Sequence, residues 1–219
     1  MYERILAIGD IHGEWDKFIS LYKQIDFCPQ KDLLIFLGDY IDRGPNSLRT
    51  LEWMISHCQY ENIIMLRGNH EQMMIDFCES RGEDDSWLFN GGDITARELQ
   101  LQGIETIERC FDFIKGLPLS WQIEISGKKF FFCHAGVKPG IPLEAQDEEY
   151  LLWIRSEFYN HYKGRDIVVV GHTYTGFVEL GRTTPIIKEN MIMVDTGAYM
   201  PDGHISCVNV LSGQIWQSH

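Results

Sequence analysis

The first eighty residues contain three units in which an apolar run, a polar loop and an amphipathic segment follow one another. The apolar runs have the lengths of short buried strands and cover residues 4–10, 33–37 and 62–66. Helical patterns follow them at about 14–25, from 45 onward and around 73–77. Helices that connect consecutive strands in this way imply parallel strands with right-handed crossovers. We therefore expect the three strand ends to meet at one edge of a sheet.

The second half is richer in strand patterns and poorer in helix. Apolar runs at 121–125 and 129–133 flank Ser126 and Gly127, which predicts a hairpin. Further short apolar runs lie at 167–170, 191–194, 205–211 and 214–216, the last two forming a closing hairpin. We therefore expect this half to form a second sheet that packs on the first.

The 219 residues are enough for one sizeable domain with a small insertion. Residues 80–116 have a mixed helical pattern, so we expect a single domain spanning 1–219 with a helical insertion at about 80–116. The acidic stretch 144–149 predicts a mobile loop.

The formal net charge of −13 argues against the basic face with which nucleic-acid-binding proteins displace counterions. It leaves phosphate chemistry open, because metal cations and a few arginines can dominate the local field. The sequence contains no run of eighteen apolar residues and no secretory leader, so we expect a cytoplasmic protein without membrane attachment. Its six widely spaced cysteines form no CxxC pair, which predicts buried free thiols.

Polar residues of metal-ligand type follow five of the apolar runs. The run 33–37 breaks at Gly38 and is followed by Asp39, Asp42 and Arg43. Alone, these three residues could equally be a helix cap and a surface ion pair. The ligand-type residues at the five strand ends are Asp10, His12, Asp39, Asn69, His134 and His172.

Carboxylates, imidazoles and an amide suit first-row ions such as Mn²⁺, Fe or Zn²⁺, and the lack of cysteine in the set argues against structural zinc. Six such groups are too many for one ion. Two metals about 3.5–4 Å apart that share one carboxylate would use them all, as in two-metal hydrolases. The sequence therefore predicts two divalent metal ions.

Five motifs resemble, in order and spacing, those of the phosphoprotein phosphatase branch of the calcineurin-like metallophosphoesterases. They are Gly9-Asp-Ile-His-Gly13, Gly38-Asp-Tyr-Ile-Asp-Arg-Gly44, Arg67-Gly-Asn-His-Glu71, His134-Ala-Gly136 and Gly171-His-Thr173. The run 67–76, with Trp87-Leu88 and Asn90-Gly-Gly92, is similar to that of small bacterial and phage serine/threonine phosphatases. The resemblance covers residues 4 to about 210 and implies an α/β fold with two mixed sheets packed as a sandwich flanked by helices.

The resemblance also implies a role for each matching residue. Asp10 and His12 would hold the first metal, Asp39 would bridge, and Asn69, His134 and His172 would complete the second site. His70 is similar to the general acid of the family, and Asp42 to the carboxylate that orients it. Arg43, Arg67 and Arg155 resemble arginines that bind the substrate phosphate.

The implied activity is hydrolysis of phosphoserine or phosphothreonine, and also of phosphotyrosine, in a protein or peptide. A hydroxide held by both metals would attack phosphorus in line, while His70 protonates the leaving oxygen. Two cations offset the charge of the phosphate dianion, and a planar arginine suits two of its oxygens. Mn²⁺ is the expected metal, with Fe, Zn²⁺ and Ni²⁺ as alternatives, and we expect a monomer that binds no nucleic acid.

Two other functions compete with this one. A symmetrical dinucleoside tetraphosphate hydrolase shares the scaffold, but the Asp42–Arg43 pair favours the protein phosphatase. A non-catalytic metal-binding protein could instead contact a partner through the acidic stretch 144–149. The chain's complete set of predicted metal ligands, general acid and phosphate-binding arginines argues against that non-catalytic function.

Overall fold

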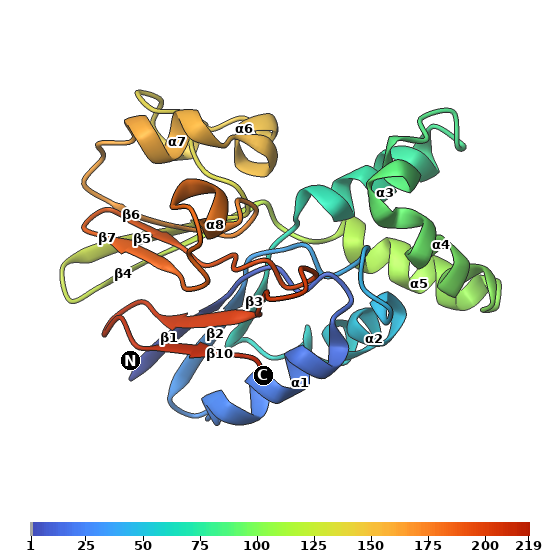
Figure 1. Ribbon diagram of the computed structural model, residues 1–219, viewed down its shortest axis with the longest axis horizontal. Coiled ribbons are helices and arrows are strands. Elements are labelled where there is room, and N and C mark those ends of the chain that lie inside the picture. Colours follow the sequence, from blue (N-terminus) through green and yellow to red (C-terminus); the bar gives the residue numbers. More distant parts are fainter. Residues whose placement is uncertain (1) are drawn as a thin grey trace.

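The computed structural model describes residues 2–219 (Figure 1). β1 (Arg4–Ile8) is the central strand of the first sheet, which has the order β10-β9-β1-β2-β3. β1 is parallel to β2 (Asp32–Phe36), and β2 is parallel to β3 (Ile63–Met65). This agrees with the crossovers predicted from the first eighty residues, so the carboxyl ends of these strands lie at one edge.

The closing hairpin corrects one expectation. β9 (Ser206–Asn209) and β10 (Ile215–Gln217) do form an antiparallel pair, but β9 then pairs antiparallel with β1. The hairpin therefore belongs to the first sheet and not to the second. Without it, the N–H and C=O groups along one side of β1 would lack a partner strand.

The second sheet has the order β4-β5-β6-β8-β7. The predicted hairpin is present as β4 (Ser120–Ile125) and β5 (Lys128–Cys133), joined by two residues with φ of 52° and 73°, which suits a primed turn. β6 (Ile167–Val170) is parallel to β5 and to β8 (Met191–Met193). β7 (Ile186–Lys188) closes the sheet antiparallel to β8.

Alternation along the strands divides the core into layers. Ile5 and Ala7 of β1 pack with Phe130, Phe132 and Val169 in the core between the two sheets. The intervening residues of β1 face the opposite way, onto the helices of the first half. A third apolar cluster joins the outer face of the second sheet to the helices after residue 147. The predicted sandwich with helices on its outer faces is thus the observed architecture.

Helices connect the strands of the first half and extend beyond β3. They are α1 (Trp15–Ile25), α2 (Ser47–His57), α3 (Asn69–Glu79), the π-helical turn η1 (Leu88–Gly92), α4 (Asp93–Gln100) and α5 (Ile104–Lys115). Pro45 precedes α2, which corrects its expected place inside that helix. In Figure 1, α3, α4 and α5 lie to one side of the sheets. The last three helical segments lie within residues 80–116, whereas the single domain with an insertion there stays a prediction.

The second half contains more helix than expected. It carries η2 (Leu143–Ala145), α6 (Glu148–Trp153), α7 (Ser156–His161) and α8 (Thr175–Val178). The acidic stretch 144–149 is therefore not a plain loop: it contains part of a 3₁₀ turn and the start of α6. Acidic residues in the first turn of a helix interact favourably with its dipole, which accounts for this correction.

The sequence predicts buried free thiols and no membrane-spanning segment, and residues 2–219 bear on both expectations. All six cysteines are free thiols, of which Cys110, Cys133 and Cys207 are buried while Cys58 and Cys78 are exposed. No helix in that range is long and apolar enough to cross a bilayer.

Candidate metal and phosphate site

The predicted ligands converge where loops from both sheets meet. Asp10 and His12 follow β1, Asp39 follows β2, and Asn69 is the first residue of α3. His134 and His172 follow β5 and β6 of the second sheet. All six side chains are buried. The structure therefore brings the complete predicted set together at the shared edge of the sandwich.

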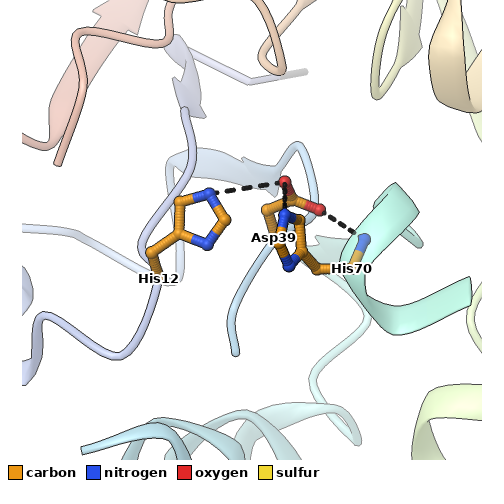
Figure 2. A group of neighbouring side chains, drawn as sticks. All are labelled: His12, Asp39 and His70. Carbon is orange, nitrogen blue, oxygen red and sulfur yellow. Dashed lines mark hydrogen bonds and ion pairs between the residues drawn. The ribbon is translucent and has the colours of Figure 1, made fainter. Parts of the chain in front are cut away.

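Asp39 lies close to both His12 and His70 (Figure 2). Its Oδ1 accepts a hydrogen bond from the backbone N of His70 at 3.0 Å and lies 3.4 Å from His134 Nε2. Its Oδ2 lies 3.5 Å from His12 Nε2 and 4.0 Å from His70 Nε2. A β-carbon on Gly68 would come within 2.2 Å of Asp39 Oδ1, so only glycine allows α3 to approach this closely.

Glu71 fixes the loop that carries Asp39. Its carboxylate accepts hydrogen bonds from the backbone N of Asp39 and Tyr40, both at 2.8 Å, and of Gly68 at 2.9 Å. Burial raises the pKa of Glu71 to about 7 despite these donors. The side chain thus caps α3 and also ties its first turn to the loop after β2.

Hydrogen bonds set the tautomers of two imidazoles. His12 Nδ1 lies 2.9 Å from the carbonyl O of Ile41, and His134 Nδ1 lies 2.8 Å from the carbonyl O of Leu37. Because a carbonyl only accepts, each Nδ1 carries the proton and each Nε2 keeps a lone pair toward the cluster. Metal-ligating histidines usually have this outer hydrogen bond.

Burial keeps these imidazoles neutral. It lowers the pKa of His12 and of His172 well below the usual value, and that of His134 to about 3. His172 Nε2 is buried and has no hydrogen-bond partner among residues 2–219. The cluster therefore contains a buried imidazole nitrogen, His172 Nε2, that no hydrogen-bonding group of residues 2–219 satisfies.

The donor atoms form two overlapping groups. Asp39, His134 and His172 each offer an atom within 4.8 Å of the others, and Asn69 Oδ1 lies 2.8 Å from His134 Nε2 and 2.9 Å from His172 Nδ1. The other group contains His12, Asp39 and His70 within the same limit. This second grouping includes His70, which the sequence placed outside the ligand set.

The chemistry of the set fits a pair of divalent cations. Asp10 Oδ1 accepts a hydrogen bond from the backbone N of His172 at 2.9 Å, and its Oδ2 lies 3.9 Å from His12 Nε2. Burial raises the pKa of Asp10 and of Asp39, and neighbouring carboxylates raise both further. Buried, crowded oxygen and nitrogen acceptors of this kind need a positive charge between them.

Next to this cluster, His70 and Asp42 form a direct pair. His70 Nδ1 lies 2.7 Å from Asp42 Oδ2, and neither side chain is more than 1% exposed. Asp42 also accepts hydrogen bonds from Trp87 Nε1 at 2.8 Å and from Thr95 Oγ1 at 2.6 Å. Burial raises the pKa of Asp42 to about 7, although these donors oppose the shift. The predicted partners are therefore in contact.

The sequence did not identify Trp87 and Thr95 as parts of the site. Both come from the helical segments after α3. Trp87 accompanies the run 67–76 in the resemblance to small bacterial and phage phosphatases, and that was its one signal. Thr95 gave none, because its role depends on how α4 packs against the loop after β2.

The model of the calcineurin-like phosphoesterase family matches residues 3–190, which include every predicted metal ligand. The chain belongs to the calcineurin-like phosphoesterase family. This confirms the resemblance drawn from the five motifs.

Relatives of this phosphoesterase include bacterial protein phosphatases. Serine/threonine-protein phosphatase 1 of Salmonella typhimurium is 31% identical over 205 residues, covering 90% of this chain and 88% of that protein. Serine/threonine-protein phosphatase 2 of Escherichia coli is 31% identical over 199 residues, with the same coverage.

Two solved structures share the phosphoesterase fold over almost the whole chain. A proposed diadenosine tetraphosphatase superimposes with a TM-score of 0.73 at 19% identity, covering 99% of this chain and 95% of that one. A serine/threonine phosphatase of Saccharomyces cerevisiae, similar to human phosphatase PP5, gives 0.66 at 18% identity and covers 99% and 79%. At these identities the comparison supports the fold.

The three predicted arginines of this phosphoesterase differ in position. Arg43 Nη1 lies 2.9 Å from His12 Nε2, and Arg155 Nη1 donates to the carbonyl O of His172 at 3.1 Å, so both reach the cluster. Arg67 instead donates to Gln72 and to carbonyls at the end of α5. The structure therefore does not bring the Arg67 guanidinium to the other two.

Three other polar residues make structural contacts. Tyr40 is fully buried and donates its hydroxyl to the carbonyl O of Leu66 at 2.6 Å. Asp195 accepts a hydrogen bond from the backbone N of Gly197 at 2.8 Å. His204 Nδ1 lies 2.7 Å from the carbonyl O of Ser218.

Proposed function

We propose that this phosphoesterase is a protein phosphatase that hydrolyses phosphoserine and phosphothreonine, and more broadly phosphotyrosine, in proteins or peptides. The observation that carries the proposal is the 2.7 Å contact between His70 and Asp42 beside the ligand cluster. Such a pair can protonate an alkoxide leaving group, which a phosphoserine or phosphothreonine ester requires. The bacterial relatives named serine/threonine-protein phosphatases support the same substrate class.

The proposal includes two divalent cations, of which Mn²⁺ is the expected ion. Asp10, His12 and Asp39 would hold the first, and Asp39, Asn69, His134 and His172 the second. When bound, the pair would neutralise phosphate oxygens and lower the pKa of a coordinated water. Tautomers already fixed by Ile41 and Leu37 support this assignment, because they direct the Nε2 lone pairs of two histidines inward.

His70 would donate the proton to the leaving oxygen from Nε2. Its Nδ1 is engaged by Asp42, which leaves Nε2 on the side of Asp39. Burial lowers the pKa of His70, whereas an Asp42 carboxylate at hydrogen-bond distance favours the protonated ring. Trp87 and Thr95 would hold the Asp42 carboxyl in the orientation that suits this contact.

Arg43 and Arg155 would bind the phosphate oxygens. Planar guanidinium groups can donate two parallel hydrogen bonds to phosphate, and they stay charged at neutral pH. Among residues 2–219, no carboxylate oxygen lies within 4.0 Å of the guanidinium nitrogens of Arg43 or Arg155. Both groups therefore keep N–H donors for a substrate. Arg67 would first have to leave the carbonyls of α5.

The working environment follows from the same proposal. The buried free thiols of Cys110, Cys133 and Cys207 suit a reducing compartment such as the cytoplasm. A phosphorylated protein or peptide is the proposed partner, and a monomer is the proposed state.

Parallel assays with Mn²⁺ test the substrate class. A phosphoserine peptide, a phosphotyrosine peptide and diadenosine tetraphosphate should be compared by kcat/KM, with p-nitrophenyl phosphate as a general phosphomonoester. The proposal expects the phosphoserine peptide to exceed the dinucleotide by at least about tenfold, a 1.4 kcal/mol difference in transition-state binding. A preference for the dinucleotide would identify a tetraphosphate hydrolase, and no hydrolysis of any substrate would identify a binding protein.

A further inference from the structure

Tyr199 lies against the phosphate-binding arginine. Its ring centroid is 4.4 Å from Arg43 Cζ, which is the geometry of a cation–π contact. The same ring meets the imidazole of His12 edge-on, with centroids 5.2 Å apart. The side chain is 39% exposed, so it lies at the mouth of the site.

The loop that carries Tyr199 is closed on itself. Thr196 and His204 pair across its base, with the Thr196 hydroxyl donating to the carbonyl O of His204 at 2.6 Å. Gly203 packs so closely on Gly197 that a β-carbon at 203 would lie 1.6 Å from the carbonyl O of Gly197. The loop therefore presents Tyr199 from a fixed base.

Lys17 of α1 ties this loop to the rest of the protein. Its Nζ donates to the carbonyl O of Ala198 at 2.6 Å and of Gly203 at 2.9 Å. These bonds hold the residues on both sides of Tyr199. A side chain anchored in this way can position a neighbour at a low entropic cost.

Arg43 has few other contacts that fix the position of its guanidinium. Its backbone N donates to the carbonyl O of Gly91 at 3.2 Å, and its Nη1 contacts His12 Nε2. That lone pair serves one partner at a time, so a cation on His12 Nε2 would release the guanidinium. The ring of Tyr199 would then be the contact that keeps the guanidinium over the cluster.

We infer that Tyr199 is a positioning residue that holds the Arg43 guanidinium in the phosphate-binding orientation. This rests on the proposed phosphate role of Arg43 and goes beyond it by assigning a residue that acts through the arginine. The ring face makes the contact, so Tyr199→Phe preserves it and Tyr199→Ala removes it.

The test measures phosphate binding together with turnover. In the Mn²⁺-loaded enzyme, Tyr199→Ala should raise both the KM for p-nitrophenyl phosphate and the Ki of inorganic phosphate by roughly 2- to 30-fold, the range of a cation–π contact. The value of kcat should change less, metal content should stay at the wild-type level, and Tyr199→Phe should restore both constants. Tyr60→Ala, at a tyrosine 49% exposed in the loop after α2, is the matched control and should leave them unchanged.

A double-mutant cycle decides whether the effect passes through Arg43. In an Arg43→Ala background, Tyr199→Ala should cause no further rise in the Ki of phosphate. The inference is overturned if the rise is as large in that background, or if Tyr199→Phe is as weak as Tyr199→Ala. Loss of the phosphopeptide preference alone would contradict the proposed function and leave this result standing. If p-nitrophenyl phosphate is not hydrolysed, calorimetric titration with phosphate gives the same comparison.

Discussion

His70 Nδ1 and Asp42 Oδ2 lie 2.7 Å apart, although the two residues come from different strand–helix units. His70 is the second residue of α3, whereas Asp42 belongs to the loop after β2. Glu71 links these segments through hydrogen bonds to three backbone N–H groups. The geometry of the pair is therefore fixed by backbone contacts as well as by its own hydrogen bond.

His70→Asn tests the assignment of the acid. Asparagine cannot deliver a proton from the position of Nε2, so we expect turnover of p-nitrophenyl phosphate to fall by roughly 10²-fold or more. Steady-state kinetics measure the loss, and metal analysis of the same sample supplies the control. Metal content should stay near that of the wild type. If the variant loses metal instead, His70 belongs to the ligand set together with His12 and Asp39.

Trp87→Phe tests the support of Asp42. The indole N–H lowers the pKa of this carboxyl, so its removal should raise that pKa above the value of about 7. Asp42 then becomes anionic at a higher pH, and the acid limb of the kcat profile should move to higher pH. Trp216→Phe, on β10 and away from the site, is the control. A profile that does not move, or moves to lower pH, would show that Asp42 does not govern this limb.

Metal loading should stabilise the fold measurably. At a Mn²⁺ concentration about 100 times Kd, binding contributes about 2.7 kcal/mol, which is a rise of about 5–10 °C in Tm for a chain of this size. Asp39→Asn should lose most of that rise. Because burial and Glu71 disfavour the charge of Asp39, the metal-free variant should melt no lower than the metal-free wild type.

Thermal scans with and without EDTA measure both effects. Asp76→Asn, an exposed position on α3, should behave like the wild type. An equal rise in Tm for Asp39→Asn would mean that the cation binds elsewhere.

Asp32 should make stability depend on pH. Burial alone would raise its pKa, but hydrogen bonds from Arg4 and from the backbone N of Cys28 outweigh this, so the pKa is lowered from 3.8. The ionised group thus stabilises the fold above the unfolded pKa, and this contribution is lost as the pH falls through the folded value. Asp32→Asn should cost about 1.5–3 kcal/mol near neutral pH, the scale for hydrogen bonds to a charged group.

Urea denaturation at several pH values measures this difference. The gap between the wild type and Asp32→Asn should begin to narrow as the pH falls below the unfolded pKa of about 3.9. It should close only once the pH has passed the lowered pKa of the folded protein, because both proteins then carry a neutral side chain. A gap of constant size would assign the loss to packing at the start of β2.

The metal-ligand cluster was predictable because strand ends leave a clear pattern. An apolar run followed by Gly-Asp or by His indicates both the end of a strand and the group placed there, and parallel pairing brings such ends together. Asp10, Asp39 and His134 therefore meet as expected. Such reasoning needs only the order of strands and not the packing of side chains.

Other parts of the site depend on packing that the sequence does not reveal. Trp87 and Thr95 reach Asp42 across 45 and 53 residues, through the way that η1 and α4 pack on the loop after β2. Arg67 follows the same kind of strand end as the ligands, yet its guanidinium is bound by carbonyls at the end of α5. A long side chain takes the acceptors that the fold supplies, and those acceptors are distant in sequence.

The position of β9 has a consequence for synthesis of the chain. The partner of β1 on that side is made almost a full chain length later, since Ile8 pairs with Cys207. Until then the nascent chain can form β1, β2 and β3 but must leave one side of β1 open, and pairing at such long sequence separation is slow. Asp10 and His12 follow β1 directly, so until then they extend from an incomplete sheet. The finished site therefore depends on a strand that is synthesised 199 residues after its partner residue Ile8, and a chain stalled before it would expose an edge prone to aggregation.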